Sequence, residues 1–208
     1  MSESIQYLAR SGGERIAYVR SAGSGSAIAP GIIFCGGFKS DMTGSKALYL
    51  EALCRRQGRA FVRFDYLGHG QSSGEFLEGT IGRWKEDALA VLQELTVGPQ
   101  IVVGSSMGGW IALLLALERP ERICGLLGIA AAPDFTETLV WQRLSAQQQA
   151  EFKQRGQLVE PSEYDDEAPY VISYRLVEEG RQQLVLPRAE QTLDLHQVTA
   201  EILSFPVP

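Results

Sequence analysis

The sequence is poor in histidine, with only His69 and His196 among its 208 residues, so few imidazoles are available for acid–base or metal chemistry. It has three cysteines, and no Cys/His spacing in it is typical of a metal site. Neither a G-x-G-x-x-G loop nor a Walker signature occurs, and no apolar run reaches the roughly 18 residues of a membrane span. These absences lead us to expect no cofactor, no bound metal and no membrane-spanning helix.

The sequence also lacks any concentration of charge of one sign. Its net charge is −6 and its charged residues are scattered, which argues against nucleic acid and anionic membrane surfaces as partners. Cys35, Cys54 and Cys124 lie in apolar or helical patterns, and the first residues lack the basic and apolar segments of a signal peptide. An odd number of cysteines in such settings favours reduced core thiols, so we expect a cytoplasmic location.

Up to residue 130, strand patterns alternate with helical patterns. Short apolar segments predict strands, and apolar residues recurring at spacings of three and four predict helices. This alternation, with continuously apolar strands, is typical of an α/β fold whose mostly parallel sheet is covered by helices on both faces. The predicted strands are 5–9, 15–19, 30–35, 60–65, 100–104 and 123–130, and the predicted helices are 45–57, 81–96 and one that ends before Pro120.

The character of the sequence changes after Pro133. Residues 135–183 contain no buried-strand pattern; within them, 141–155 is expected to be helical and 161–169 to be an acidic loop. We expect residues 1–134 and 184–208 to form the core, with one more helix at 190–203. Residues 135–183 are then a helical cap over the carboxyl edge of the sheet, where ligands bind in such folds. The alternative is an excursion that faces only solvent.

The most informative segment is Gly104-Ser105-Ser106-Met107-Gly108, which lies between an apolar run at 101–103 and a longer one at 110–117. Strand, sharp turn and helix in this order are typical of a nucleophile elbow. The helix N-terminus would favour negative charge developing beside the Ser106 hydroxyl. The alternative is a glycine-rich turn that only leads into a buried helix. A second G-x-S-x-G, centred on Ser72, has no such flanks and is predicted to be a loop.

Three segments together resemble the α/β-hydrolase superfamily of serine hydrolases. They are Gly36-Gly37-Phe38, the stretch Asp65-Tyr66-Leu67-Gly68-His69-Gly70-Gln71-Ser72, and the elbow with its following Gly109. Within the superfamily, residues 38–44 and 63–66 resemble a group of small, cap-bearing acyl-protein thioesterases and acyl-glucuronide esterases. The resemblance implies a hydrolase fold, a serine nucleophile and no cofactor.

The resemblance also implies roles for three residues of the elbow and of the loop at 36–38. Ser106 maps to the nucleophile. The oxyanion hole maps to the backbone N–H groups of Met107, which follows the serine, and of Phe38, in the loop after the third strand. Many relatives carry His-Gly where this sequence has Gly36-Gly37, so a side chain that braces the loop is missing here.

In this family the triad follows the order Ser, acid, His, with the acid after the strand that follows the cap and the histidine after the final strand. The sequence stops at Pro208, where relatives enter that strand. We therefore expect the last two strands to be absent and this chain alone to be weakly active or inactive. Stand-ins within the chain are His196, which the order permits, and Asp134, which would orient a histidine or cap the next helix. His69 and Asp65 match structural positions of the family.

These observations predict a serine hydrolase that cleaves carboxylic esters or thioesters through an acyl-enzyme on Ser106. The alternative from another class is a truncated or degenerate relative that binds ligands without catalysis. A third possibility is a peptidase or lactonase on the same scaffold. The expected partner is a small ester or thioester substrate, and an uncovered sheet edge would favour self-association.

Overall fold

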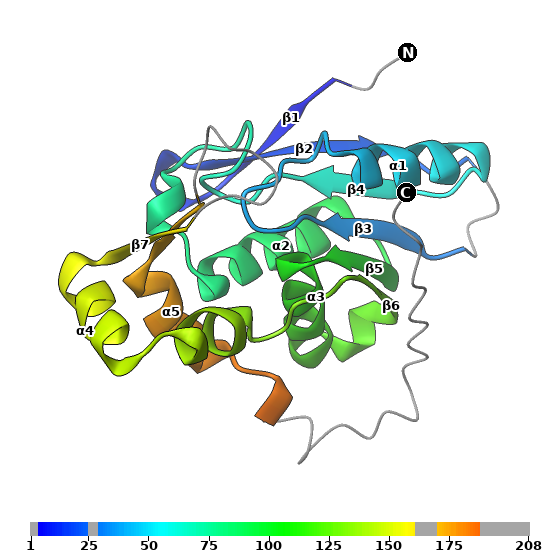
Figure 1. Ribbon diagram of the computed structural model, residues 1–208. Coiled ribbons are helices and arrows are strands. Elements are labelled where there is room, and N and C mark those ends of the chain that lie inside the picture. Colours follow the sequence, from blue (N-terminus) through cyan, green and yellow to red (C-terminus); the bar gives the residue numbers. More distant parts are fainter. Residues whose placement is uncertain (1–3, 25–28, 161–169, 188–208) are drawn as a thin grey trace.

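The computed structural model describes residues 4–24, 29–160 and 170–187, which form a sheet with helices on both faces and a smaller unit at one end (Figure 1). The sheet has six described strands in the order β1-β2-β4-β3-β5-β6, of which the last four run parallel and the first two form an antiparallel hairpin. The strands are β1 (Gln6–Ala9), β2 (Arg15–Ser21), β3 (Gly31–Cys35), β4 (Phe61–Phe64), β5 (Gln100–Ser105) and β6 (Ile123–Ile129).

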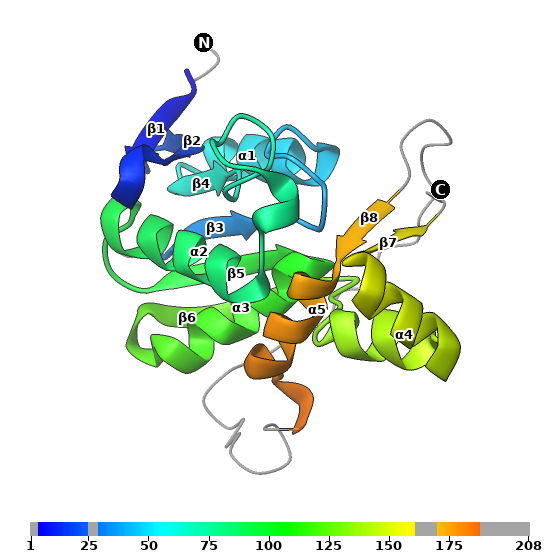
Figure 2. The same cartoon turned by 90° about the vertical axis from the view of Figure 1, so that its left-hand side faces the viewer.

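Each face of the sheet is covered by different helices, because side chains alternate along each strand. Ile33 of β3 and Val102 of β5 face the cluster that contains α2 (Ile81–Leu95) and α3 (Met107–Glu118). Phe34 and Val103, each one position further along its strand, pack with α1 (Ser45–Arg56) on the other face. Figures 1 and 2 show this division, and the mostly parallel architecture expected from the sequence is confirmed.

The strand at 123–130 was expected to be buried, and that expectation is wrong. Only Ile123 is buried in β6, and the remaining residues of this strand are partly or fully exposed. The physical reason is position, since β6 is the edge strand of the described sheet. The same position exposes Cys124, so the expected core thiols are confirmed for Cys35 and Cys54 alone.

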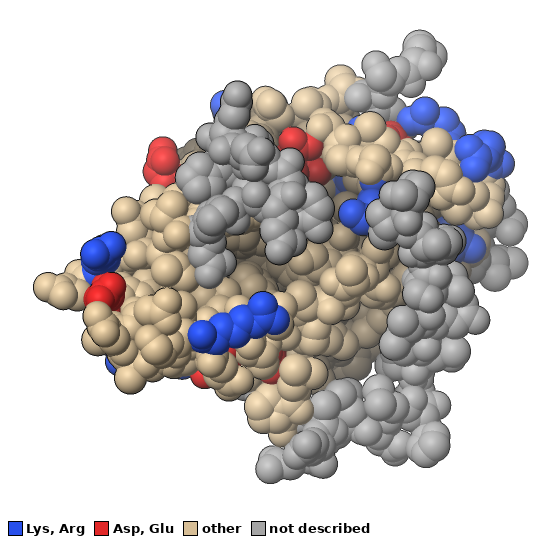
Figure 3. All heavy atoms as spheres, viewed as in Figure 1, with Lys and Arg blue, Asp and Glu red and all other residues tan. Residues whose placement is uncertain are grey.

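Charge is less evenly distributed than the sequence suggests. Lys46, Arg55 and Arg56 are exposed on α1, and Figure 3 shows basic side chains gathered over this helix. No helix within the described ranges has the length and apolar character needed to cross a bilayer.

Residues 135–183 begin with a π-helical turn, Thr136–Val140, and a 3₁₀ turn, Trp141–Arg143. The helix predicted for 141–155 is confirmed in part as α4 (Ala146–Arg155), which starts at a Ser145–Gln148 capping box and ends at the left-handed Gly156. An antiparallel pair, β7 (Gln157–Glu160) and β8 (Tyr170–Ser173), then leads to α5 (Tyr174–Gly180).

Because residues 135–183 show no sequence pattern typical of a buried strand, the β7–β8 pair was not predicted. Each strand has only four residues, too few for a period-two pattern to stand out, and Ile172 is buried whereas Val159 is exposed. The acidic loop predicted at 161–169 and the helix predicted at 190–203 lie outside the described residues.

The two ends of this unit are joined at its base by Asp134. The carboxylate of Asp134, which is 2% exposed, accepts hydrogen bonds from the backbone N–H groups of Val185 and Leu186, each at 2.9 Å. Arg181 donates to Glu137 across the same junction at 2.8 Å. These contacts bring the chain that leaves the unit back to the place where it entered.

Replacing Asp134 with Asn tests this junction. The amide accepts with only one oxygen, so one buried N–H loses its partner, and we expect the free energy of unfolding to fall by about 1–3 kcal/mol. Cleavage near residues 180–187 in limited proteolysis should also become faster. Asp41→Asn is the matched control, because Asp41 is exposed and bonds only within its own turn. Equal stability of the two variants would contradict the account.

Candidate active site

Ser106 lies on a sharp turn between β5 and α3, in a backbone conformation that residues other than glycine rarely adopt. Its φ is 52° and its ψ is −120°. The Ser106 N–H donates to the carbonyl of Ile129 at 3.0 Å, and the Ser106 carbonyl accepts from Gly109 and Ala132 at 2.9 and 3.1 Å. The end of β6 therefore holds the turn from one side, and the predicted strand–turn–helix geometry is present.

Three glycines allow the turn to pack against the ends of β3 and β5. A Cβ atom on Gly108 would overlap the carbonyl oxygen of Cys35, and one on Gly104 would overlap the backbone of Gly108. A Cβ atom on Gly109 would overlap the side chain of Ala131. The N-terminus of α3 thus lies directly on the carboxyl end of β3, and this brings the loop after β3 next to Ser106.

That loop places Gly37 against the serine. A Cβ atom built on Gly37 would lie 3.4 Å from the Cβ of Ser106. The Gly37 carbonyl accepts from the Ser40 hydroxyl at 2.8 Å and from the Ser40 N–H at 3.2 Å. Because C=O and N–H point in opposite directions across a trans peptide, the Phe38 N–H faces away from Ser40. Neither the Phe38 N–H nor the Met107 N–H is a donor in the turn and loop backbone hydrogen bonds of the described residues.

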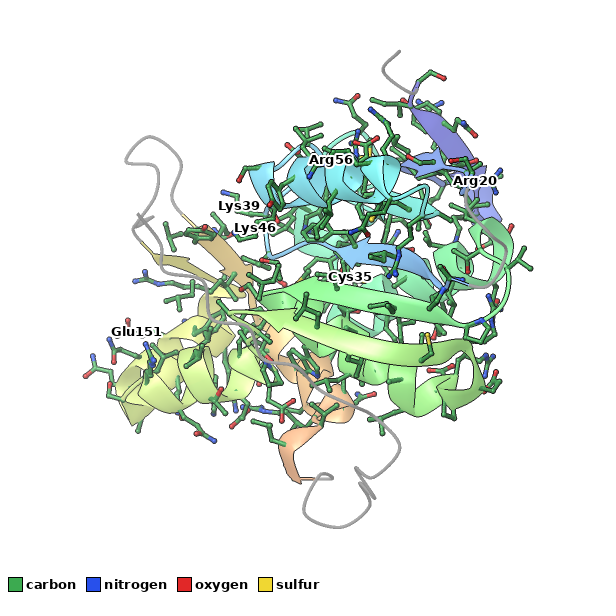
Figure 4. All side chains as sticks on the ribbon, turned by 90° about the vertical axis from the view of Figure 1, so that its right-hand side faces the viewer. Arg20, Cys35, Lys39, Lys46, Arg56 and Glu151 are labelled. Atoms are coloured by element: carbon green, nitrogen blue, oxygen red, sulfur yellow. The ribbon has the colours of Figure 1, made fainter. Side chains whose placement is uncertain are left out.

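The Phe38 side chain joins this loop to both parts of the molecule. Its ring contacts Phe76 and Trp84 of the core, with centroids 5.0 and 6.1 Å away, and Phe135 and Tyr170 of the 135–183 unit, at 5.7 and 6.1 Å. Aromatic pairs of this kind contribute about 0.5–1.5 kcal/mol each beyond the area they bury. Lys39, labelled in Figure 4, places its ammonium group 5.4 Å from the centre of the Tyr170 ring.

His69 is buried in an aromatic cluster. Its ring centroid lies 5.5 Å from that of Tyr66 and 5.0 Å from those of Phe76 and Trp84. Neither ring nitrogen has a partner among the described residues, and burial lowers the pKa of His69 to about 4. Aromatic rings enclose the imidazole and neither of its nitrogens makes a hydrogen bond to Ser106, so His69 does not act as a base for Ser106 in this position, which agrees with the structural role that the resemblance implies. His196 lies outside the described residues.

Two further sequence candidates have other partners. The carboxylate of Asp134 is held by the base of the 135–183 unit, as described above. In the helical turn that follows, the N–H groups of Glu137 and Thr138 donate to the backbone carbonyl of Asp134, and the Asp134 side chain does not cap this turn. The Ser72 hydroxyl accepts from the N–H of Ala17 at 2.8 Å and donates to the carbonyl of Asp65 at 2.6 Å. The second G-x-S-x-G is therefore a structural loop, as predicted.

Cys35 is the remaining nucleophilic side chain close to the turn, and it lies at the end of β3 (Figure 4). Complete burial raises the pKa of its thiol to about 12, so the thiolate is not available at neutral pH. Among the described residues, no group of three or more His, Cys, Asp or Glu side chains could hold a metal ion.

Comparisons with known proteins bear on the family to which the chain belongs. Residues 31–193 match the family described as serine aminopeptidase, S33. The chain is 40% identical over 183 residues to mouse "Palmitoyl-protein thioesterase ABHD10, mitochondrial", covering 88% of this chain and 60% of that protein. It is 38% identical over 183 residues to the human protein of the same name, covering 88% of this chain and 58% of that protein. The chain thus spans about 60% of the length of these curated relatives.

Two solved structures show the same fold. The structure of mouse alpha/beta hydrolase domain-containing protein 10 superimposes with a TM-score of 0.80 at 39% identity, covering 88% of this chain and 72% of the other. A hydrolase from Agrobacterium vitis gives a TM-score of 0.83 at 39% identity, covering 90% and 74%. The α/β-hydrolase fold expected from the sequence is confirmed.

The expected cytoplasmic location is contradicted by these comparisons, because the curated ABHD10 relatives are named mitochondrial. Unpaired thiols indicate a reducing environment, and they do not identify the compartment that provides it. Cys35 and Cys54 are buried free thiols, so their state does not distinguish one compartment from another.

Gly108→Ala tests whether close packing fixes the turn. The new methyl group would overlap the Cys35 carbonyl, and we expect the free energy of unfolding to fall by about 1–3 kcal/mol or more. Gly36→Ala is the control, because the nearest atom to its Cβ position is the Ser40 hydroxyl at 3.6 Å. Urea denaturation of both variants provides the measurement, and equal stability would argue against the packing described here.

His69→Phe tests the buried imidazole through the pH dependence of stability. A histidine whose folded pKa is about 4 instead of 6.5 lowers stability as pH falls through this range, because the unfolded chain takes up the proton first. Burial raises the pKa of Asp87 from 3.8 to about 6, which has the opposite effect and remains in the variant.

When the pH is lowered from about 7 to about 4.5, the free energy of unfolding of the His69→Phe variant should therefore rise by about 1–3 kcal/mol relative to that of the unmodified protein. Urea titrations at both pH values measure this difference. A difference that does not change with pH would mean that His69 is not the group responsible.

Proposed function

The chain belongs to the serine aminopeptidase S33 family of α/β hydrolases, and on that basis we propose that it is a serine hydrolase that cleaves carboxylic esters or thioesters. The observation that carries the proposal is the strained turn at Ser106, with the Gly37–Phe38 peptide packed against it. In this proposal Ser106 is the nucleophile. The N–H groups of Met107 and Phe38 are the oxyanion donors.

The reaction would proceed in two steps. The Ser106 oxygen attacks the carbonyl carbon, the negative charge moves to the carbonyl oxygen, and two backbone N–H groups donate to it. The thiolate or alkoxide then leaves with a proton, and water hydrolyses the acyl-serine in the second step. One oxyanion donor contributes about 2.7–4 kcal/mol to such a transition state. The N-terminus of α3 favours the same charge.

The reaction also needs a base that accepts the Ser106 proton. His69 is excluded by its burial, and no described side chain makes a hydrogen bond to the Ser106 hydroxyl. We propose that the base and its orienting acid come from outside the described residues. A serine without a base retains only about 10³–10⁴-fold catalysis over water, from the oxyanion hole and substrate binding.

We propose thioesters as the main substrate class. The support is that curated relatives at 38–40% identity are named palmitoyl-protein thioesterases. The partly exposed rings of Phe135 and Tyr170 contact Phe38, which lies on the loop beside Ser106, and apolar side chains of this kind suit the acyl part of such a substrate.

We propose residues 1–134 and 184–208 as the catalytic core and 135–183 as a cap. The support is the junction at Asp134, where the chain enters and leaves the unit at one place. Figures 1 and 2 also show β7, β8 and α4 at the end of the sheet toward which β3 and β5 run, where Ser106 lies. A unit in this position would control access to the serine.

The non-catalytic alternative is favoured by one observation, which is that no base contacts Ser106 among the described residues. Such a protein would bind acylated ligands at the same turn without turnover. The following experiment separates the two functions.

We expect slow hydrolysis of a short acyl thioester by the chain, and we expect added imidazole to increase the rate by supplying the base. Ser106→Ala should remove both the basal rate and the imidazole-dependent increase, leaving only the reaction of imidazole itself. Ser105→Ala is the matched control, since it removes a hydroxyl one position earlier and should retain the activity. Release of free thiol is the measurement. Identical rates for the unmodified protein and Ser106→Ala would support the binding function instead.

A further inference from the structure

The loop of residues 36–44, which carries Phe38, is held at Met42 by two side chains from the end of β4. Met42 is 2% exposed. Its N–H donates to the carboxylate of Asp65 at 2.6 Å, and its carbonyl accepts from the guanidinium of Arg63 at 3.0 Å. Both backbone polar groups of this one buried residue, which belong to two successive peptide units, are therefore bound by side chains of a neighbouring strand and of the residue after it.

These two side chains are themselves fixed by further contacts. Arg63 also donates to the carboxylate of Glu51 on α1 at 3.0 Å, and both residues are buried. Asp65 is 1% exposed, and its second oxygen accepts from the N–H of Gln71 at 2.8 Å. Buried charged groups with all partners in place hold their neighbours in one arrangement. The anchor at Met42 is therefore rigid.

Only three residues, Lys39, Ser40 and Asp41, separate Phe38 from Met42. Ser40 binds back to the Gly37 carbonyl through both its N–H and its hydroxyl. The segment between Gly37 and Met42 is thus a short, hydrogen-bonded link, so the position of Met42 determines the orientation of the Gly37–Phe38 peptide. That peptide carries the proposed oxyanion donor.

We propose that Arg63 and Asp65 are positioning residues for the oxyanion hole, acting through Met42 on the Phe38 N–H. The inference rests on the function proposed above. Arg63 and Asp65 would then support the reaction indirectly, because their side chains bind Met42 and Glu51 and not the Ser106 hydroxyl.

A residue with a similar local environment provides the control. Asp87 on α2 is also 1% exposed, and its carboxylate accepts from the N–H of Leu67 at 2.9 Å. Leu67 lies in the loop after β4, which carries no proposed oxyanion donor. Asp65→Asn weakens the hydrogen bonding of a buried carboxylate to the loop of residues 36–44, which carries Phe38. Asp87→Asn weakens the same kind of bond to the loop that contains Leu67, which does not carry Phe38.

The experiment compares the two variants in three measurements: stability in urea, kcat and KM of the Ser106-dependent thioester reaction, and amide hydrogen exchange at Phe38. We expect both variants to lose stability, and only Asp65→Asn to lower kcat, by about tenfold or more with KM changed less than about twofold. We also expect faster Phe38 exchange in Asp65→Asn alone. Equal losses of kcat in both variants, or unchanged Phe38 exchange in Asp65→Asn, would overturn the inference.

Ser40→Ala is the second variant, for the case that Asp65→Asn does not fold. Ser40 is exposed, and the substitution removes only the hydroxyl that holds the Gly37 carbonyl. We expect unchanged stability, faster Phe38 exchange and a kcat lower by about threefold to tenfold. Unchanged exchange and kcat would overturn the inference. If the thioester reaction does not depend on Ser106, the proposed function fails, whereas the exchange measurement still tests the positioning of the loop.

Discussion

The arrangement of the site depends on one steric constraint, the contact between the N-terminus of α3 and the carboxyl end of β3. Gly108 has no side chain because the Cys35 carbonyl occupies the space where its Cβ would lie. This contact places Ser106 on a turn with positive φ and brings Gly37 against it. A backbone conformation of this kind costs on the order of 1–3 kcal/mol and persists only when the surrounding structure imposes it. Here the ends of β3, β5 and β6 impose it together.

Around this contact, the loops at the carboxyl edge of the sheet are held by buried side chains. Asp65 and Arg63 bind both polar groups of Met42, and Leu67 is bound in the same way by Asp87 and by the indole N–H of Trp84. Asp134 does the same for the chain that leaves the 135–183 unit. Charged groups that are buried in this way serve as fixed points for backbone that would otherwise be free to move.

Much of the fold could be predicted from the sequence, because its signals are local. Burial in the sheet requires apolar strand residues, and close backbone packing requires the glycines around Ser106. Both requirements appear as residue patterns in the sequence. The β7–β8 pair was missed because four-residue strands show no clear periodicity, and the exposure of Cys124 was missed because an edge position depends on strand order. The anchoring roles of Asp65 and Asp134 join side chains to backbone groups 23 and 51 residues away, and such bonds leave no pattern in a single sequence.

The proposed function requires the Ser106 oxygen to lie beside two backbone N–H groups that can receive a developing oxyanion. The most direct measurement is a crystal structure of the protein after reaction with an alkyl fluorophosphonate, which leaves a tetrahedral phosphorus on a reactive serine. We expect an adduct on Ser106 whose phosphoryl oxygen lies within about 3 Å of the backbone nitrogens of both Met107 and Phe38. A phosphoryl oxygen of the adduct that faces away from either nitrogen would contradict this arrangement.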